Sequence, residues 1–211
     1  LPLLDRVAPA AEMAGVVNCI LRDEGELVGE NTEGKALLEA LRRRTDPAGK
    51  HFVLLGAGRV ARAIGVELAL THAEQITVLS RNEPAGRELV ELLCDNLEIT
   101  ASQVAWQGEY ELPPETEVLV HATSIGQGDP DARVPIVPES LAPPMIVADV
   151  TLDPPQTWLV QEASGRGGTT LDGLGMLLHQ AVPGFQMWFG VVPEVTGELH
   201  ALIERDLLSD D

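Results

Sequence analysis

The sequence predicts an α/β fold built on a doubly wound, mostly parallel sheet. From residue 50 onward, short apolar runs rich in β-branched residues alternate with segments of helical periodicity. These runs are apolar throughout, which is typical of strands that are buried on both faces. A G-x-G-x-x-A stretch stands between the first run and the first helical segment. Together these observations predict a Rossmann-like sheet, with a remnant of a second α/β domain ahead of it.

The composition is globular and strongly acidic. Hydrophobic residues make up 45% and charged residues 22%, and 14 Lys and Arg against 33 Asp and Glu give a formal charge of -19. That charge would repel nucleic acid and anionic bilayers, and no apolar run approaches the roughly 18 residues of a membrane span, so we expect neither partner. Cys19 and Cys94 match no metal-ligand spacing. We therefore expect reduced thiols, no metal and a cytoplasmic location.

Ahead of residue 50 the patterns predict a small α/β unit. Residues 1–14 are expected to be helical with a proline interruption. "GVVNCILRDEGELVGEN" predicts two short strands around the acidic turn at residues 23–25. "EGKALLEALRRR" predicts a helix whose basic last turn suits the helix dipole, and "DPAGK" ends it.

Beyond residue 50 the expected elements follow one another closely. We expect strands at 51–58, 75–81, 104–106, 116–124, 145–152 and 169–173. We expect helices at 59–71, 84–93, 155–167 and 174–190, and an amphipathic helix in the tail, 193–211.

The stretch "VLLGAGRVARAIG" has the spacing and context of a dinucleotide-binding turn, since it follows a strand and opens a helix. Gly56 would allow the tight turn, Gly58 would let the backbone approach a pyrophosphate, and Ala61 would let helix and strand pack closely. The amides of Arg59, Val60 and Ala61 would then face the anion. A tight strand–helix turn without a ligand is the alternative.

Two further strand ends point to a dinucleotide that carries a 2'-phosphate. The second strand ends in Ser80-Arg81-Asn82, without the carboxylate that would bond an adenosine 2'-hydroxyl. Arg81 can pair with a 2'-phosphate and stack on adenine, which favours NADP(H), although an exposed cation is the alternative. The residues 122–125, Ala-Thr-Ser-Ile, are suited to line the nicotinamide-ribose side of the crevice.

Motifs along nearly the whole chain match one family in the same order. They are "GVVNCI" (A-V-N-T), "GENTEG" (N-T-D-G), "GAGRVARA" (G-A-G-G-A-A-R-A), "LSRN" (N-R-T), "HATSIG" (N-A-T-S-x-G), "DVTLDPPQT" (D-x-x-Y-x-P-x-x-T) and "LDGLGMLLHQA" (D-G-L-x-M-L-x-x-Q-A). The chain resembles the shikimate dehydrogenases, the family to which the patterns in parentheses belong.

This resemblance implies a two-domain enzyme that reduces 3-dehydroshikimate to shikimate with NADPH, in aromatic amino-acid (chorismate) biosynthesis. Residues 1–32 would be the remnant of the substrate domain, 33–190 the NADP-binding domain, and 191–211 a helix packing back toward the substrate domain. Asn18, Glu33 and Gln180 match substrate-binding positions, and Glu33 stands at the place of the catalytic Asp. The implied cofactor contacts are Gly56, Ala57, Gly58, Arg59, Val60, Ala61, Ser80, Arg81, Asn82, Ala122, Thr123, Ser124, Ile125, Val150, Gly173 and Met176.

Several positions depart from the family pattern. The catalytic Lys of a P-[HF]-K motif would lie ahead of Leu1, so we expect the chain to be amino-terminally incomplete. Glu33 replaces the motif Asp, Leu152 a Tyr, Cys19 a Thr and His121 an Asn. These replacements leave open a non-catalytic NADP-binding module, or a dehydrogenase of quinate or another cyclic hydroxy acid. A homodimer, or a fusion to another domain of the same pathway, also stays open.

Overall fold

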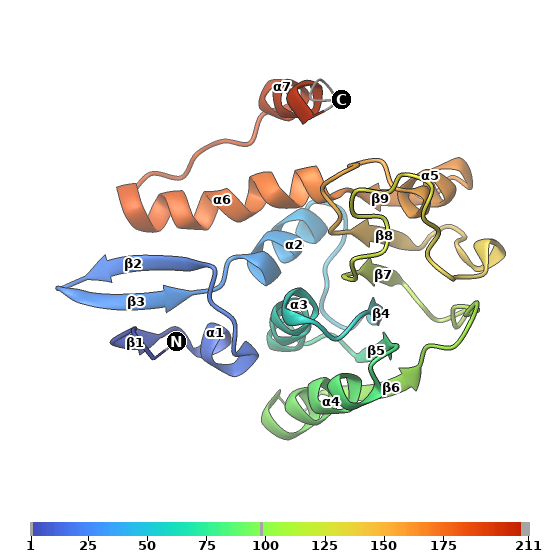
Figure 1. Cartoon of the computed structure of the whole chain (residues 1–211), viewed down its shortest axis with the longest axis horizontal. Coiled ribbons are helices and arrows are strands. Elements are labelled where there is room, and N and C mark those ends of the chain that lie inside the picture. The colour runs from blue at the N-terminus through green and yellow to red at the C-terminus, as the bar shows by residue number, and fades with distance from the viewer. Residues whose placement is uncertain (1, 98, 208–211) are drawn as a thin grey trace.

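A six-stranded, all-parallel sheet forms the centre of the molecule (Figure 1). The computed structural model describes residues 2–97 and 99–207. The strand order β6-β5-β4-β7-β8-β9 reverses direction between β4 and β7, which is the switch point of a doubly wound sheet. The predicted fold class is confirmed. The strands are β4 (His51–Leu55), β5 (Gln75–Ser80), β6 (Thr100–Ala105), β7 (Val118–His121), β8 (Ile146–Asp149) and β9 (Thr169–Leu171).

Helices and loops cover the two faces of this sheet. Leu54, Val120 and Ala148 belong to the core cluster that contains α2 (Glu33–Arg42), α3 (Arg59–Leu70) and α4 (Glu83–Leu97). Their chain neighbours point to the opposite face, because side chains alternate along a strand. There Leu55, Leu119 and Val147 pack with α5 (Trp158–Gly165) and with the irregular segments between β6 and β8, which include the 3-10 turn η1 (Pro138–Ser140).

A small second sheet lies beside the first in Figure 1, with the order β1-β3-β2. The expected hairpin is present: β2 (Cys19–Asp23) and β3 (Glu26–Glu30) pair antiparallel around Glu24 and Gly25, both with positive φ. The expected helix at 1–14 is wrong in its first half. Arg6–Val7 form β1, which pairs in parallel with β3, and only Pro9–Ala14 are helical (α1). Leu1 lies outside the described residues.

The long helix α6 (Gly173–Phe189) packs on α2 and extends toward the small sheet. Trp188 near its end donates from Nε1 to the carbonyl of Ile20 on β2, at 3.0 Å. The last helix, α7 (Gly197–Leu207), contacts α6, and residues 208–211 of the expected tail helix lie outside the described part of the chain. None of the described helices is long and apolar enough to cross a bilayer. The domain boundaries at residues 32 and 190 stay predictions.

Candidate functional site

A large cavity of about 860 Å³ lies at the carboxyl ends of β4, β5, β7 and β8. Ligands bind at this edge in doubly wound sheets, beside the switch point. Ala85, Trp106, Gln127 and Thr151 line it without having been predicted, and of these Trp106 and Thr151 had a usable signal, their place after a strand end. The lining residues that the sequence predicted are Gly56, Ala57, Gly58, Arg59, Val60, Ser80, Arg81, Asn82, Ala122, Thr123, Ser124 and Val150.

The glycine loop forms the floor of this large cavity. Gly56 has φ +108, and a β-carbon there would lie 2.7 Å from the carbonyl oxygen of Ala122, so a side chain cannot be accommodated. A β-carbon on Gly58 would meet no protein atom within 4 Å. Helix α3 begins at the next residue, Arg59, and the amides of its first turn have no intrahelical acceptor. Open space beside free amides is the cradle that a pyrophosphate requires.

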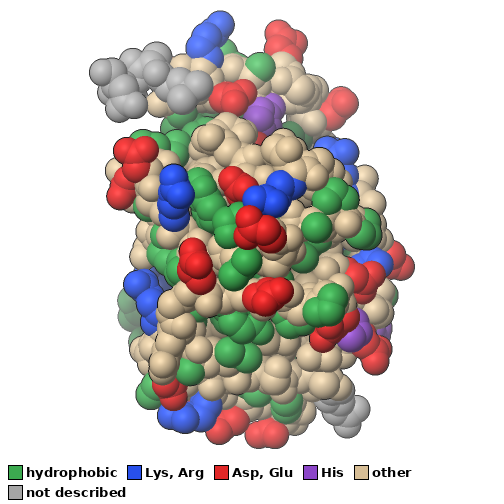
Figure 2. Space-filling view, turned by 90° about the vertical axis from the view of Figure 1, so that its right-hand side faces the viewer, with side chains coloured by type: hydrophobic (Ala, Val, Ile, Leu, Met, Phe, Trp, Pro, Cys, Tyr) green, Lys and Arg blue, Asp and Glu red, His purple; other side chains and the backbone are tan. Residues whose placement is uncertain are grey.

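Two arginines bring positive charge to this cavity. Arg59 and Arg81 both line it, and neither forms an ion pair within residues 2–97 and 99–207. The loop around Arg81 is held by its neighbours: the Ser80 hydroxyl donates to the carbonyl of Asn82 (2.9 Å), and the Asn82 side chain accepts from the amide of Ala85 (3.2 Å). Elsewhere, as on the face in Figure 2, acidic and basic side chains are interspersed. The fixed loop leaves the Arg81 guanidinium available to an anion.

Two smaller cavities continue the large one toward the small sheet. One of about 520 Å³ includes Asn18 and Glu33 and shares Arg59 and Val60 with the large cavity. The other, of about 110 Å³, shares Val60 and Val150 with the large cavity. The three spaces therefore form one cleft. The second of these cavities is lined by Glu33, Val60, Val150, Leu152, Gly173, Met176, Leu177 and Gln180.

The three predicted substrate residues all lie in this continuation of the cleft. Asn18 accepts from the amide and the hydroxyl of Thr32 through Oδ1 (2.9 and 3.3 Å), and within the described chain its Nδ2 has no protein partner. The amide of Glu33 donates to Asn31 Oδ1 at 3.0 Å, which fixes the start of α2 at the cleft. An amide donor and a carboxylate acceptor on one wall are suited to a polyhydroxylated small molecule.

Not every predicted contact reaches the large cavity. Ala61 is fully buried within α3, where it packs in the core between helix and sheet. Ile125 packs against the cluster on the α5 face. Gly173 and Met176 line the 110 Å³ cavity, together with Glu33 and Gln180, and Met176 also lines a cavity of about 500 Å³ that includes Leu37 and His179. The described residues hold no group of three or more metal ligands, and Cys19 and Cys94 are both free.

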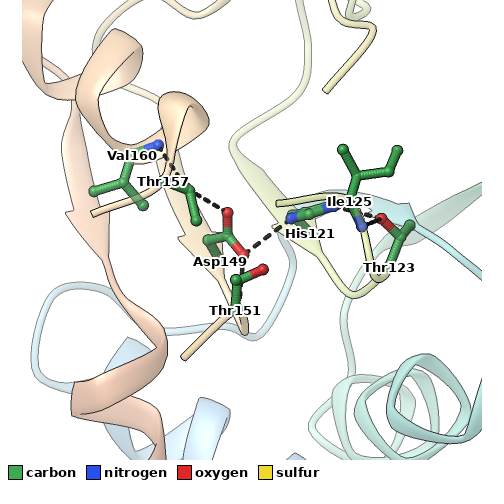
Figure 3. Close-up of polar contacts among 7 residues, drawn as sticks. All are labelled: His121, Thr123, Ile125, Asp149, Thr151, Thr157 and Val160. Atoms are coloured by element: carbon green, nitrogen blue, oxygen red, sulfur yellow. Dashed lines mark hydrogen bonds and ion pairs between the residues drawn. The ribbon is translucent and has the colours of Figure 1, made fainter. Parts of the chain in front are cut away.

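A buried polar network lies behind the loop that follows β7 (Figure 3). His121 Nδ1 lies 2.9 Å from Asp149 Oδ1, and its Nε2 lies 2.6 Å from the hydroxyl of Thr123. The other Asp149 oxygen accepts from the Thr157 hydroxyl at 2.7 Å. Burial alone would raise the pKa of Asp149, but these hydrogen bonds and the charge of His121 outweigh burial and hold the pKa below its ordinary value.

The sequence is similar to curated shikimate dehydrogenases. The enzyme "Shikimate dehydrogenase (NADP(+))" of Desulforamulus reducens is 36% identical over 200 residues, which are 92% of this chain and 69% of that protein. The chain belongs to the shikimate dehydrogenase family. No protein-family model matches the sequence.

Two solved structures are similar to the chain over nearly its whole length. The ligand-free 5-ketofructose reductase of Gluconobacter sp. strain CHM43 superposes with a TM-score of 0.91 at 43% identity, over 99% of this chain and 73% of that one. The shikimate dehydrogenase of Thermus thermophilus, solved with NADP(H) and shikimate, superposes with a TM-score of 0.76 at 30% identity, over 97% and 72%.

Proposed function

We propose that the chain binds NADP(H) in the large cavity and belongs to an enzyme that reduces 3-dehydroshikimate to shikimate. The observation that carries this proposal is the continuous cleft, which joins the glycine loop and Arg81 to Asn18, Glu33 and Gln180. The names of the Desulforamulus and Thermus relatives support it. In keeping with this role we propose a cytoplasmic location, and a homodimer or a fused pathway domain as the setting of the chain.

The cavity residues fit this cofactor on their own chemistry. Gly58 leaves room for the pyrophosphate beside the first amides of α3, and Arg81 offers a guanidinium for the 2'-phosphate. With the 2'-phosphate held by Arg81 after β5, Thr123 and Val150, which follow β7 and β8, would hold the nicotinamide end. When bound, NADPH supplies the hydride for ketone reduction.

The residues of the cavity that adjoins the large one at Val60 would hold the ketone. The free Nδ2 of Asn18 can donate to a substrate oxygen, and the carboxylate of Glu33 can accept from a hydroxyl. In the family pattern, the proton for the alkoxide comes from a Lys that pairs with a carboxylate at the position of Glu33. We propose that Glu33 orients such an acid. Its side chain is longer than that of the Asp in the family pattern, which would shift the acid relative to the ketone and could suit a different ketone.

That last point leads to a second candidate, the reduction of 5-ketofructose. The Gluconobacter reductase is 43% identical to this chain, more than the shikimate dehydrogenases with which it is compared above. Leu152 also lines the 110 Å³ cavity where the shikimate dehydrogenase pattern has a Tyr. A cyclic or open-chain polyhydroxy ketone needs hydroxyl partners and no carboxylate partner, and Asn18, Glu33 and Gln180 meet that requirement.

NADPH oxidation by the full-length gene product decides between the two substrates. We expect turnover with 3-dehydroshikimate, and a higher kcat/KM for 5-ketofructose would make the second candidate the function. In the same protein, Arg81→Ala should weaken NADP binding about tenfold or more and weaken NAD binding much less, because NAD keeps the adenine and lacks the 2'-phosphate. A preference for NAD in the wild type would contradict the cofactor assignment. Failure to oxidise NADPH with either ketone or with dehydroquinate, even after Glu33→Asp and Leu152→Tyr, would favour a non-catalytic module.

A further inference from the structure

The buried network of Figure 3 connects the two loops that border the nicotinamide end of the large cavity. His121 and Asp149 are paired residues of the neighbouring parallel strands β7 and β8, so their side chains project from the same face of the sheet. Both are buried, with 0% and 2% of their surfaces exposed. The network ends on Thr123 in one loop and on the amide of Thr151 in the other, and both of these residues line the cavity.

The hydrogen-bond partners of Asp149 determine which nitrogen of His121 carries a proton. Asp149 accepts from the amide of Thr151 and from the hydroxyl of Thr157, besides its contact with His121. Burial raises the pKa of Asp149, but the contact with His121 and these two donors outweigh burial and hold the pKa low, so Asp149 is a carboxylate at neutral pH and can only accept. Nδ1 of His121 must therefore carry a proton, and Nε2 faces Thr123.

The second His121 nitrogen controls the Thr123 hydroxyl. The Thr123 oxygen already accepts from the amide of Ile125 at 3.1 Å. With neutral His121, the Thr123 hydroxyl donates to Nε2, and the buried pair has a net charge of -1. With protonated His121, Nε2 donates to Thr123, the hydroxyl proton becomes available to the cavity, and the pair is neutral.

We propose that His121 is a positioning residue for the nicotinamide end of the cofactor, and that its charge sets the relative affinity for the oxidised and reduced forms. The inference rests on the proposed NADP(H) binding. The oxidised nicotinamide is cationic and the reduced one is neutral. A pair with net charge -1 behind the loop therefore favours NADP⁺, and protonation of His121 removes that preference.

Asp149 is the charged group that contacts His121 in the described chain. On the side of β7 away from β8, the neighbouring strand β4 places Leu55 beside His121. The segment ahead of α5 contributes the hydroxyl of Thr157, which donates to Asp149 and accepts from the amide of Val160. While Asp149 stays a carboxylate, His121 is therefore the group of this network whose charge can change.

The test is the ratio of the Kd values for NADP⁺ and NADPH, measured by fluorescence titration of the full-length protein between pH 6 and 8. Both forms carry the same phosphates, so the ratio cancels phosphate titration. In the wild type we expect NADP⁺ to lose about fivefold in affinity relative to NADPH as the pH falls. In His121→Asn, the family's residue, the ratio should not vary with pH. Thr123→Val should weaken both forms and keep the pH dependence.

The matched control is His179→Asn, because His179 is also buried but lines a different cavity, between α2, α6 and α7. This variant should keep the wild-type pH dependence. If His121→Asn does not fold, His121→Gln replaces it. A flat ratio in the wild type, or an unchanged pH dependence in the His121 variants, overturns the inference alone. Failure of the wild type to bind either nucleotide overturns the proposed function as well.

Discussion

Two glycines of one turn have opposite reasons to be glycine. Gly56 is confined by the protein, with φ +108 and a carbonyl 2.7 Å from any β-carbon. Gly58 has φ -78 and open space around it, so nothing in the protein requires its lack of a side chain. The free space at Gly58 therefore leaves room for the proposed pyrophosphate, and the confinement at Gly56 reflects the fold.

This difference predicts opposite effects of the same substitution. Gly58→Ala should leave the free energy of unfolding within about 0.5 kcal/mol of wild type, and weaken NADP binding about 10- to 100-fold by filling the phosphate cradle. Gly56→Ala should lower the free energy of unfolding by about 1–3 kcal/mol. Chemical denaturation and nucleotide titration measure the two effects. Equal nucleotide affinity in Gly58→Ala and wild type would argue against a pyrophosphate at this turn.

At the level of elements, α2 and α3 approach unusually closely. A β-carbon on Gly34 of α2 would lie 2.5 Å from the carbonyl oxygen of Ala63 in α3. This close contact brings the first turn of α2, and Glu33 with it, against the start of the cofactor helix. The absence of a side chain at Gly34 thus allows α2 to place Glu33 in the cleft.

Substitution of Gly34 by Ala should push these helices apart. We expect the free energy of unfolding to fall by about 1–3 kcal/mol, because backbone atoms of α3 cannot move aside alone. Gly65→Ala in α3 is the control, since its β-carbon would meet only side chains at 3.6–3.7 Å. That variant should gain about 0.5–1 kcal/mol from helix propensity. Urea unfolding measures the free energy of unfolding of both variants. Equal values for Gly34→Ala and Gly65→Ala would contradict this account of the α2–α3 contact.

The order of strands and helices was predictable because each carries its own pattern. Buried strands such as β4 and β7 are apolar except for one terminal histidine each, and α2 and α3 follow helical periodicity. β1 was missed because two residues carry no periodicity and pair with a strand some twenty residues later. The glycine loop and Arg81 were found from local spacing. The network of His121 and Asp149 was not, because it depends on the register between β7 and β8.

At the scale of the whole molecule, one buried carboxylate links stability to pH. The pKa of Asp149 lies below its ordinary value, about 3.9, in the folded protein. The unfolded chain therefore binds this proton first as the pH falls. The stabilisation is present above about pH 4 and is lost as the pH drops through the folded pKa.

We accordingly expect the free energy of unfolding to fall as the pH is lowered below about 4, and to fall less in Asp149→Asn. The difference between the two proteins should amount to about 1.4 kcal/mol for each unit by which folding depresses the pKa. Urea unfolding at a series of pH values measures it. If the free energy of unfolding depends on pH in the same way in wild type and Asp149→Asn, other carboxylates determine the loss of stability in acid.

The large cavity is also lined by a tryptophan whose fluorescence should respond to a bound cofactor. Trp106 lines it and is almost fully buried, whereas Trp188 is 56% exposed at the far end of α6, and Trp158, which begins α5, does not line this cavity. A reduced nicotinamide absorbs light in the range where tryptophan emits. Energy transfer from Trp106 to a bound dinucleotide would therefore quench the indole emission, and the protein carries its own fluorescent reporter of cofactor occupancy.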